Sequence, residues 1–196
     1  MSKSFWSRTL IFAGAALLAA GSGFAATVVP LSLSDLVAQS DLAIEGKIGS
    51  GAPDWSGPAG ASMIFTYWEV EVTETLKGTV TASLLVRTPG GTKDGRSLEV
   101  PGAPSFHPDQ RLILFLKKTE ESRSGQPVYE VLGWQQGALD IMTEPASGEP
   151  VVRRPVKSSQ KQPSRLVAVK LKDFKREVQA LAQPAAETKP LPEVSP

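Results

Sequence analysis

The chain has 196 residues, with 21 Lys and Arg against 20 Asp and Glu, a single histidine and no cysteine. Without cysteine it can form neither disulfides nor thiolate metal sites. The near balance of charge argues against nucleic-acid binding, because proteins hold the phosphate backbone mainly with an excess of Lys and Arg. The length fits one domain.

The N-terminus is predicted to be a secretory signal peptide that is cleaved after Ala25. Lys3 and Arg8 precede an uncharged apolar run over residues 10–20, and Gly23 and Ala25 supply the small residues of a cleavage site. The apolar run is too short to span a bilayer, which takes roughly 20 residues.

The signal peptide predicts an exported protein, periplasmic or secreted. After cleavage the mature chain would have 19 Lys and Arg against 20 Asp and Glu. Residues 26–180 are expected to form a single domain that ends in a helix. Residues 181–196 form a Pro-rich tail, poor in large apolar residues, that is expected to be disordered. No second apolar span follows the first, so no stable membrane insertion is expected after cleavage.

The start of the domain combines a helix signal with a strand signal. Ser32, followed three residues later by Asp35, predicts a capping-box start for a short helix that ends near Gln39. Residues 42–48 alternate between apolar and polar side chains, which is the period of a half-buried strand. Residues 51–62 are predicted to be a loop from their Gly and Pro content.

The segment IFTYWEVEV predicts the clearest strand of the chain. Trp68, Val70 and Val72 fall on one of its faces, which is expected to point into the core. Residues 80–86 repeat the alternation and are predicted to be its hairpin partner. A long polar loop is expected over residues 88–97.

The segment RLILFLKK predicts a central strand, because residues 112–116 are apolar on both faces. Two short strands, VYEVLGW and GALDIM, are expected after it, with Val151 and Val152 as a final edge. The helical spacing of apolar residues from Leu171 predicts a terminal helix. Together these elements predict a mainly β protein, a small barrel or a sandwich, with a short N-terminal and a C-terminal helix.

The only histidine, His107, is the first candidate site. A zinc site needs three or four ligands, and a Ser-His-Asp site that used His107 and Asp109 would need a nucleophile, for which no G-x-S-x-G motif exists. We therefore favour a structural loop in which Pro101, Pro104 and Pro108 stiffen the chain and position Arg111. No catalytic residue, metal ligand or cofactor is predicted.

Glu69 and Glu71 are the second candidate, since they share a strand face roughly 7 Å apart, a separation that could serve acid-base chemistry on a sugar. A solvated strand face shows the same pattern, and that interpretation is favoured. The sequence therefore gives only weak support to a hydrolase.

Three aromatic residues are the third candidate. Phe65 and Tyr67 fall on the face opposite Trp68 and are expected to point outward, near Trp55 in the preceding loop. Exposed aromatic side chains anchor partner proteins and sugars, so Phe65, Tyr67 and Trp55 are the predicted protein-binding residues. The alternative is that a loop or the terminal helix covers this end of the strand.

The order of these motifs resembles an uncharacterised family of exported bacterial proteins. The resemblance rests on the segments LSLSDLVAQSD, LAIEGKI, TYWEVEVTETLKG and VPGAPSF, the last followed by a strand that contains LFL. It covers about residues 31–142. It implies an OB-fold barrel similar to netrin-like domains and tissue inhibitors of metalloproteinases. The partner it implies is an extracytoplasmic protein, with a matrixin-type metalloprotease as the candidate.

The sequence departs from the inhibitor pattern at its N-terminus. Those inhibitors use an N-terminal cysteine to chelate the catalytic zinc, whereas the mature chain here would begin at Ala26 and has no cysteine. The resemblance therefore implies the fold and not the mechanism. The leading hypothesis is a non-enzymatic, TIMP-like exported module that binds or inhibits another protein. The alternative is a module that binds a glycan or cell-wall polymer.

Overall fold

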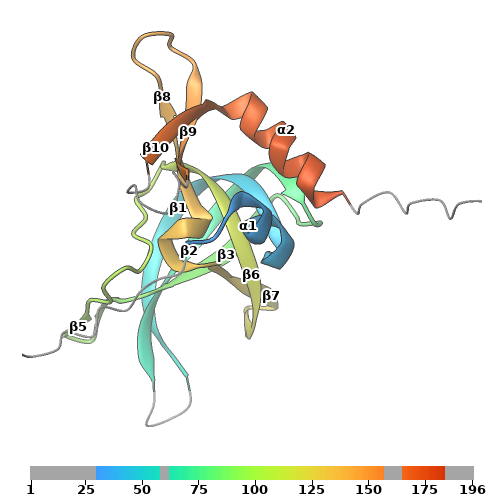
Figure 1. The fold of residues 1–196 in the computed structure, drawn as a ribbon. Coiled ribbons are helices and arrows are strands. Elements are labelled where there is room, and N and C mark those ends of the chain that lie inside the picture. The colour runs from blue at the N-terminus through green and yellow to red at the C-terminus, as the bar shows by residue number, and fades with distance from the viewer. Residues whose placement is uncertain (1–29, 58–61, 157–164, 184–196) are drawn as a thin grey trace, which may run out of the picture.

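The computed structural model describes residues 30–57, 62–156 and 165–183 (Figure 1). The signal peptide predicted over residues 1–25 and most of the predicted tail lie outside the described residues. Within them the protein is mainly β with two helices, as the sequence predicts. No described helix has both the length and the apolar character that a membrane crossing requires.

The two helices are α1 (Leu33–Gln39) and α2 (Leu171–Ala182), and η1 (Trp134–Gly137) is a short 3₁₀ turn. The strands in chain order are β1 (Leu42–Ser56), β2 (Met63–Lys77), β3 (Ser83–Pro89), β4 (Gly91–Lys93), β5 (Arg96–Leu98), β6 (Arg111–Arg123), β7 (Gln126–Val131), β8 (Ala138–Thr143), β9 (Pro150–Val156) and β10 (Arg165–Lys170).

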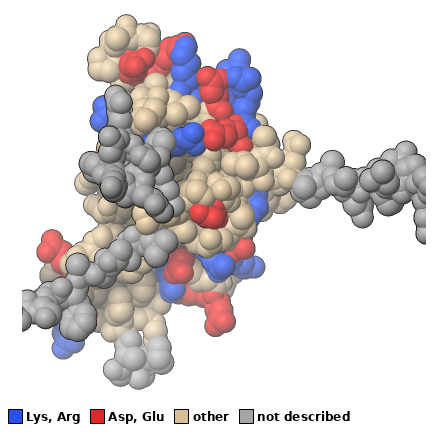
Figure 2. Space-filling view, viewed as in Figure 1, with Lys and Arg blue, Asp and Glu red and all other residues tan. Residues whose placement is uncertain are grey.

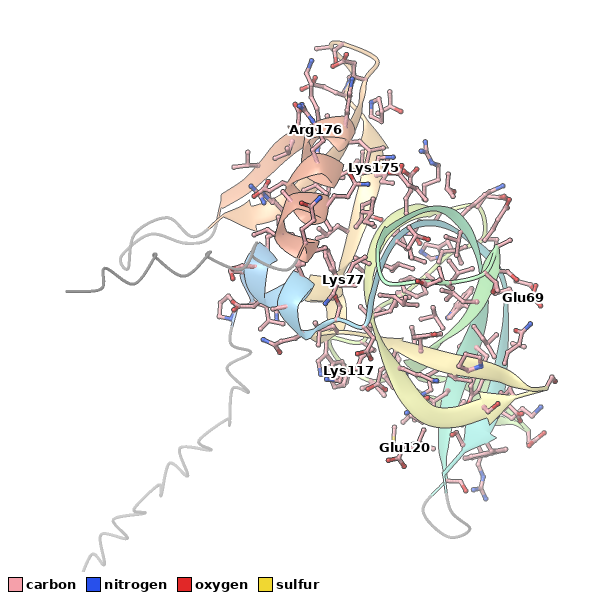
Figure 3. The ribbon with its side chains drawn as sticks, turned by 90° about the vertical axis from the view of Figure 1, so that its right-hand side faces the viewer. Glu69, Lys77, Lys117, Glu120, Lys175 and Arg176 are labelled. Carbon is pink, nitrogen blue, oxygen red and sulfur yellow. The ribbon has the colours of Figure 1, made fainter. Side chains whose placement is uncertain are left out.

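The main sheet has the strand order β1-β2-β3-β7-β6-β8-β9-β10, and β1 also pairs with β6. The pairings of β1, β2, β3, β7 and β6 therefore return to their starting strand, and we call this arrangement the strand circuit. Strands β3 and β7 are parallel, and the other neighbours in the circuit are antiparallel. In Figure 3 the curved strands of the circuit lie beside the two helices.

Strand β6 is buried on both faces, as its sequence predicts. Leu112, Leu114 and Leu116 point into an apolar cluster inside the circuit. Ile113 and Phe115 point to the other side, into a second cluster that includes residues of α1 and α2. One strand therefore supplies side chains to both halves of the core.

The predicted capping box at the start of α1 is confirmed. The Ser32 side chain accepts a hydrogen bond from the Asp35 backbone N–H, and the Asp35 carboxylate accepts one from the Ser32 backbone. At the other end of α1, Lys77 donates from Nζ to the carbonyl oxygens of Val37 at 2.5 Å and Ser40 at 2.6 Å. Figure 3 shows Lys77 beside this helix end. These bonds satisfy carbonyl groups that a helix end leaves without partners.

Helix α2 is anchored to the circuit by a buried carboxylate. Glu45 on β1 is only 1% exposed and forms ion pairs with Arg111 at 2.5 Å and Lys175 at 2.6 Å. Lys175 also pairs with Glu74 of β2 at 2.6 Å. Burial alone would raise the pKa of Glu45, but the hydrogen bonds from Lys175 and Arg111 lower it. The loop before Arg111 thus places its guanidinium beside the buried Glu45 carboxylate.

Three sequence expectations differ from the structure. The segment predicted as a loop over residues 51–62 continues β1 to Ser56, with register shifts between β1 and β2 near Ile48. The predicted polar loop over residues 88–97 contains the short hairpin of β4 and β5. The final edge is β10, which the sequence analysis did not predict, rather than Val151 and Val152. Gly, Pro and Ser hide the strand character of the first two of these segments.

We expect Phe115→Ala to lower the free energy of unfolding by about 3 to 5 kcal/mol, because the ring is fully buried and its loss leaves a cavity. Leu166→Ala is the control, since Leu166 is 63% exposed and its truncation should change stability by less than about 0.5 kcal/mol. Urea denaturation of both variants checks this. A Phe115→Ala protein as stable as the control would contradict the two-sided burial of β6.

Candidate functional site

An open groove of about 350 Å³ lies on the outer side of the strand circuit. It is lined by residues of β2, β3, β6, β7 and η1 and of the segments that precede β6 and η1. These residues are Met63, Phe65, Arg87, Pro89, Pro104, Lys117, Glu130, Val131, Leu132, Gly133 and Trp134. We call this hollow the lateral groove.

Two large apolar side chains of the lateral groove are exposed. Met63 is 41% exposed and Trp134 is 47% exposed. Phe65 and Leu132, which also line the groove, are half-buried. Exposed Met and Trp side chains that gather in a hollow are typical of interaction sites rather than of ordinary surface.

The backbone that carries Trp134 has an unusual conformation. Gly133 and Trp134 have φ angles of 65° and 61°, the left-handed region that non-glycine residues rarely adopt. A Cβ on Gly133 would lie 2.6 Å from the Leu31 side chain, so the turn is packed closely against the start of the described chain. A bulky residue in this conformation is strained, so the surrounding structure must hold the turn in place.

Arg87 is a charged residue that lines the groove. Its guanidinium donates from Nη1 to Glu121 at 2.7 Å and from Nη2 to Glu130 at 3.3 Å. The same group lies over the Phe65 ring, 4.6 Å from its centroid. The two carboxylates fix the guanidinium. Its cation–π contact therefore holds the Phe65 ring in place.

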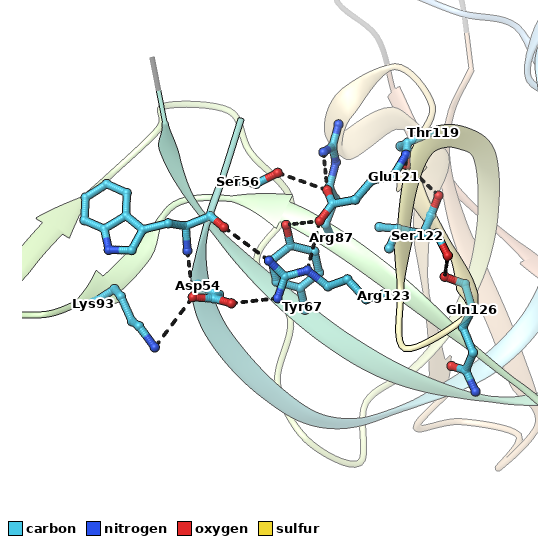
Figure 4. A network of polar contacts seen from close by, with 12 residues as sticks. Asp54, Ser56, Tyr67, Arg87, Lys93, Thr119, Glu121, Ser122, Arg123 and Gln126 are labelled. Carbon is cyan, nitrogen blue, oxygen red and sulfur yellow. Dashed lines mark hydrogen bonds and ion pairs between the residues drawn. The ribbon is translucent and has the colours of Figure 1, made fainter. Parts of the chain in front are cut away.

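Glu121 is the centre of this polar network (Figure 4). Its carboxylate accepts hydrogen bonds from Tyr67 at 2.8 Å, Arg123 at 2.9 Å, Arg87 at 2.7 Å and Ser56 at 3.0 Å. Burial would raise the pKa of Glu121, but the bonds from Arg123, Tyr67, Ser56 and Arg87 lower it to about 2. The carboxylate is therefore ionised at neutral pH and has no proton to donate.

The sequence pattern predicts an exposed Tyr67, but the structure buries it. It lies on the face opposite Trp68, but it is only 4% exposed. The Arg123 guanidinium covers its ring at 3.6 Å from the centroid, and the Tyr67 hydroxyl donates a hydrogen bond to Glu121. Burial, the largest effect, raises the pKa of Tyr67. The end of β6 folds over this face, which strand alternation alone cannot reveal.

The other two predicted binding residues lie on the paired strands β1 and β2 but have different surroundings. Phe65 lines the lateral groove. Trp55 instead donates from its indole nitrogen to Asp94 at 2.9 Å and faces Arg96 of the β4–β5 hairpin. The structure therefore does not bring Phe65, Tyr67 and Trp55 together as one surface.

The earlier catalytic candidates lie on exposed surface. His107 is exposed, and Asp109 forms an ion pair with Lys47 at 2.6 Å. Glu69 and Glu71 are exposed on the solvated face of β2. Among the described residues, no group of three or more His, Asp and Glu side chains is placed to hold a metal ion. Acidic and basic groups are mixed over the face shown in Figure 2.

Sequence reasoning missed Met63, Lys117 and Trp134. Met63 and Lys117 lie at strand positions where their residue types are ordinary. The dipeptide Gly133-Trp134 between two short strands was a usable signal for Trp134. The glycine predicts a turn at this point, and a tryptophan is an unusually bulky residue to follow it there.

No protein-family model matches the chain, and no curated protein matches its sequence. These comparisons neither support nor contradict the family resemblance drawn from the motifs. The assignment of function therefore depends on the geometry of the site.

The low pKa of Glu121 predicts a specific acid sensitivity. Its folded-state pKa, about 2, lies below the usual value of 4.5, so the network stabilises the fold above about pH 4.5 and loses that effect as the pH falls toward 2. The loss is on the order of 3 kcal/mol. Glu121→Gln should be less stable at pH 7 and should show a flatter pH dependence in this window.

The matched control is Glu120→Gln, because Glu120 is the exposed neighbour on the same strand (Figure 3). Chemical denaturation between pH 2 and 7 measures both variants. If Glu121→Gln keeps the acid sensitivity of the unaltered protein, the network does not depend on this carboxylate.

Proposed function

We propose that the protein is a non-enzymatic exported module that binds another extracytoplasmic protein through the lateral groove. One observation carries this proposal. The groove combines Met63 and Trp134, both more than 40% exposed, with Phe65 above an ordered arginine. Met, aromatic residues and Arg are the side chains that protein interfaces favour.

The volume of the groove and the fixed positions of its side chains suit a short segment of a partner protein. A volume of about 350 Å³ is at the low end of the range for ligand sites, roughly 300 to 1,000 Å³. Arg87 is held by two carboxylates and Trp134 by a constrained turn. A site whose side chains are fixed in advance loses less conformational entropy on binding.

The fold that we propose for this module is an OB-like barrel. The return of the strand circuit from β6 to β1 supports closure of the sheet. The parallel pairing of β3 with β7, among otherwise antiparallel neighbours, supports a Greek-key path rather than a simple meander. The apolar cluster around Val70 would then be the barrel interior.

The non-enzymatic character rests on the chemistry of the acids at the site. Glu121 is saturated by its donors and ionised at neutral pH. Glu130, the acid that lines the groove, accepts a hydrogen bond from Arg87. Both carboxylates thus hold arginine in position. A matrixin-type metalloprotease stays a candidate partner, without a proposed contact to its metal.

The proposal predicts a difference between two methionines of equal exposure. Met63 in the groove and Met142 on β8 are both 41% exposed. A photo-crosslinking amino acid at position 63 should capture another protein during export in the native cells, whereas the same group at position 142 should not. Immunoblotting and mass spectrometry of the adducts give the readout.

Trp134→Asn in the position 63 variant is a further control, since Asn tolerates the left-handed backbone while removing the indole. This change should abolish the adduct. Equal capture at both positions, capture of a glycan, or capture of a second copy of this chain would contradict the proposal.

A further inference from the structure

The lateral groove contains a cation without a carboxylate partner. Arg87 pairs with both Glu121 and Glu130. Lys117 also lines the groove and is exposed, yet within the described part of the chain no acidic group lies within ion-pair distance of its ammonium. Its cross-strand neighbour Glu130 is engaged by Arg87 instead. Lys117 is therefore the lining cation whose charge no described carboxylate engages.

The position of this charge matters because it is close to the apolar side chains. Lys117 shares the groove with Met63, Phe65 and Trp134. A segment that covers these side chains would displace water around the ammonium. A carboxylate brought beside Lys117 would then interact in a less polar medium than bulk water, where the attraction is stronger.

We propose that the lateral groove selects a protein segment in which an acidic residue neighbours an apolar anchor, with the carboxylate paired to Lys117. The anchor packs against Trp134, Met63 and Phe65. This inference rests on the proposed function, since it names the chemistry of the segment that the groove binds. A basic segment is disfavoured because it would place like charges together at Lys117.

The chain offers a matched pair of lysines for the test. Lys117 and Lys118 are consecutive, exposed residues of β6, and only Lys117 lines the groove. Selection of a displayed library of random short peptides on the unaltered protein should enrich sequences with an acidic residue next to an aromatic or aliphatic one. The affinity of a selected synthetic peptide is then measured by calorimetry.

Lys117→Glu should weaken the selected peptide by about tenfold or more, and Lys118→Glu by no more than about twofold. Trp134→Asn should abolish binding. Raising the salt concentration should weaken binding to the unaltered protein more than to Lys117→Glu, because an ion pair is screened.

The outcomes separate this inference from the proposed function. Enriched peptides without acidic residues, or equal effects of the two lysine variants, combined with loss of binding in Trp134→Asn, would overturn the acidic specificity and leave the groove as a protein site. Binding that survives Trp134→Asn, or a selection that enriches no peptide, would overturn both.

Discussion

The structure depends on strand β6, because each part of it has a different structural task. Leu114 packs inside the circuit and Phe115 packs against the helices, so one strand joins the two apolar clusters. Strands β7 and β8 pair with β6 along one of its edges, and β1 pairs with it along the other. Beyond the buried stretch, Lys117 lies in the groove and Glu121 holds Arg87 beneath Phe65. The core and the candidate site thus share one element.

The motifs behind the family resemblance are structural in this protein. Lys77 binds the carbonyl groups at the end of α1, and Gly78, with φ of 80°, leaves room for the Asp41 carbonyl oxygen. Gly46 sits where a Cβ would lie 2.7 Å from Val70. Phe106 packs edge-on against Trp68. These motifs therefore specify the fold, and the proposed binding residues Met63 and Trp134 fall outside all of them.

The sequence predicted the features that depend on local pattern. The capping box of α1, the two-sided burial of β6 and the core position of Val70 follow from periodicity and cap chemistry. The burial of Tyr67 did not follow, because Arg123 and Glu121 reach it from a strand more than fifty positions away in sequence. The lateral groove escaped prediction for the same reason, since its walls come from four strands that only the tertiary fold brings together.

Hydrogen exchange of the backbone amides with a selected peptide bound tests the central claim, that the lateral groove is a site for a protein segment. The account predicts slower exchange at the start of β2, near Phe65, and across η1, near Trp134, with no change on the hairpin of β8 and β9. Protection confined to that hairpin, or no protection at β2 and η1, would contradict the account.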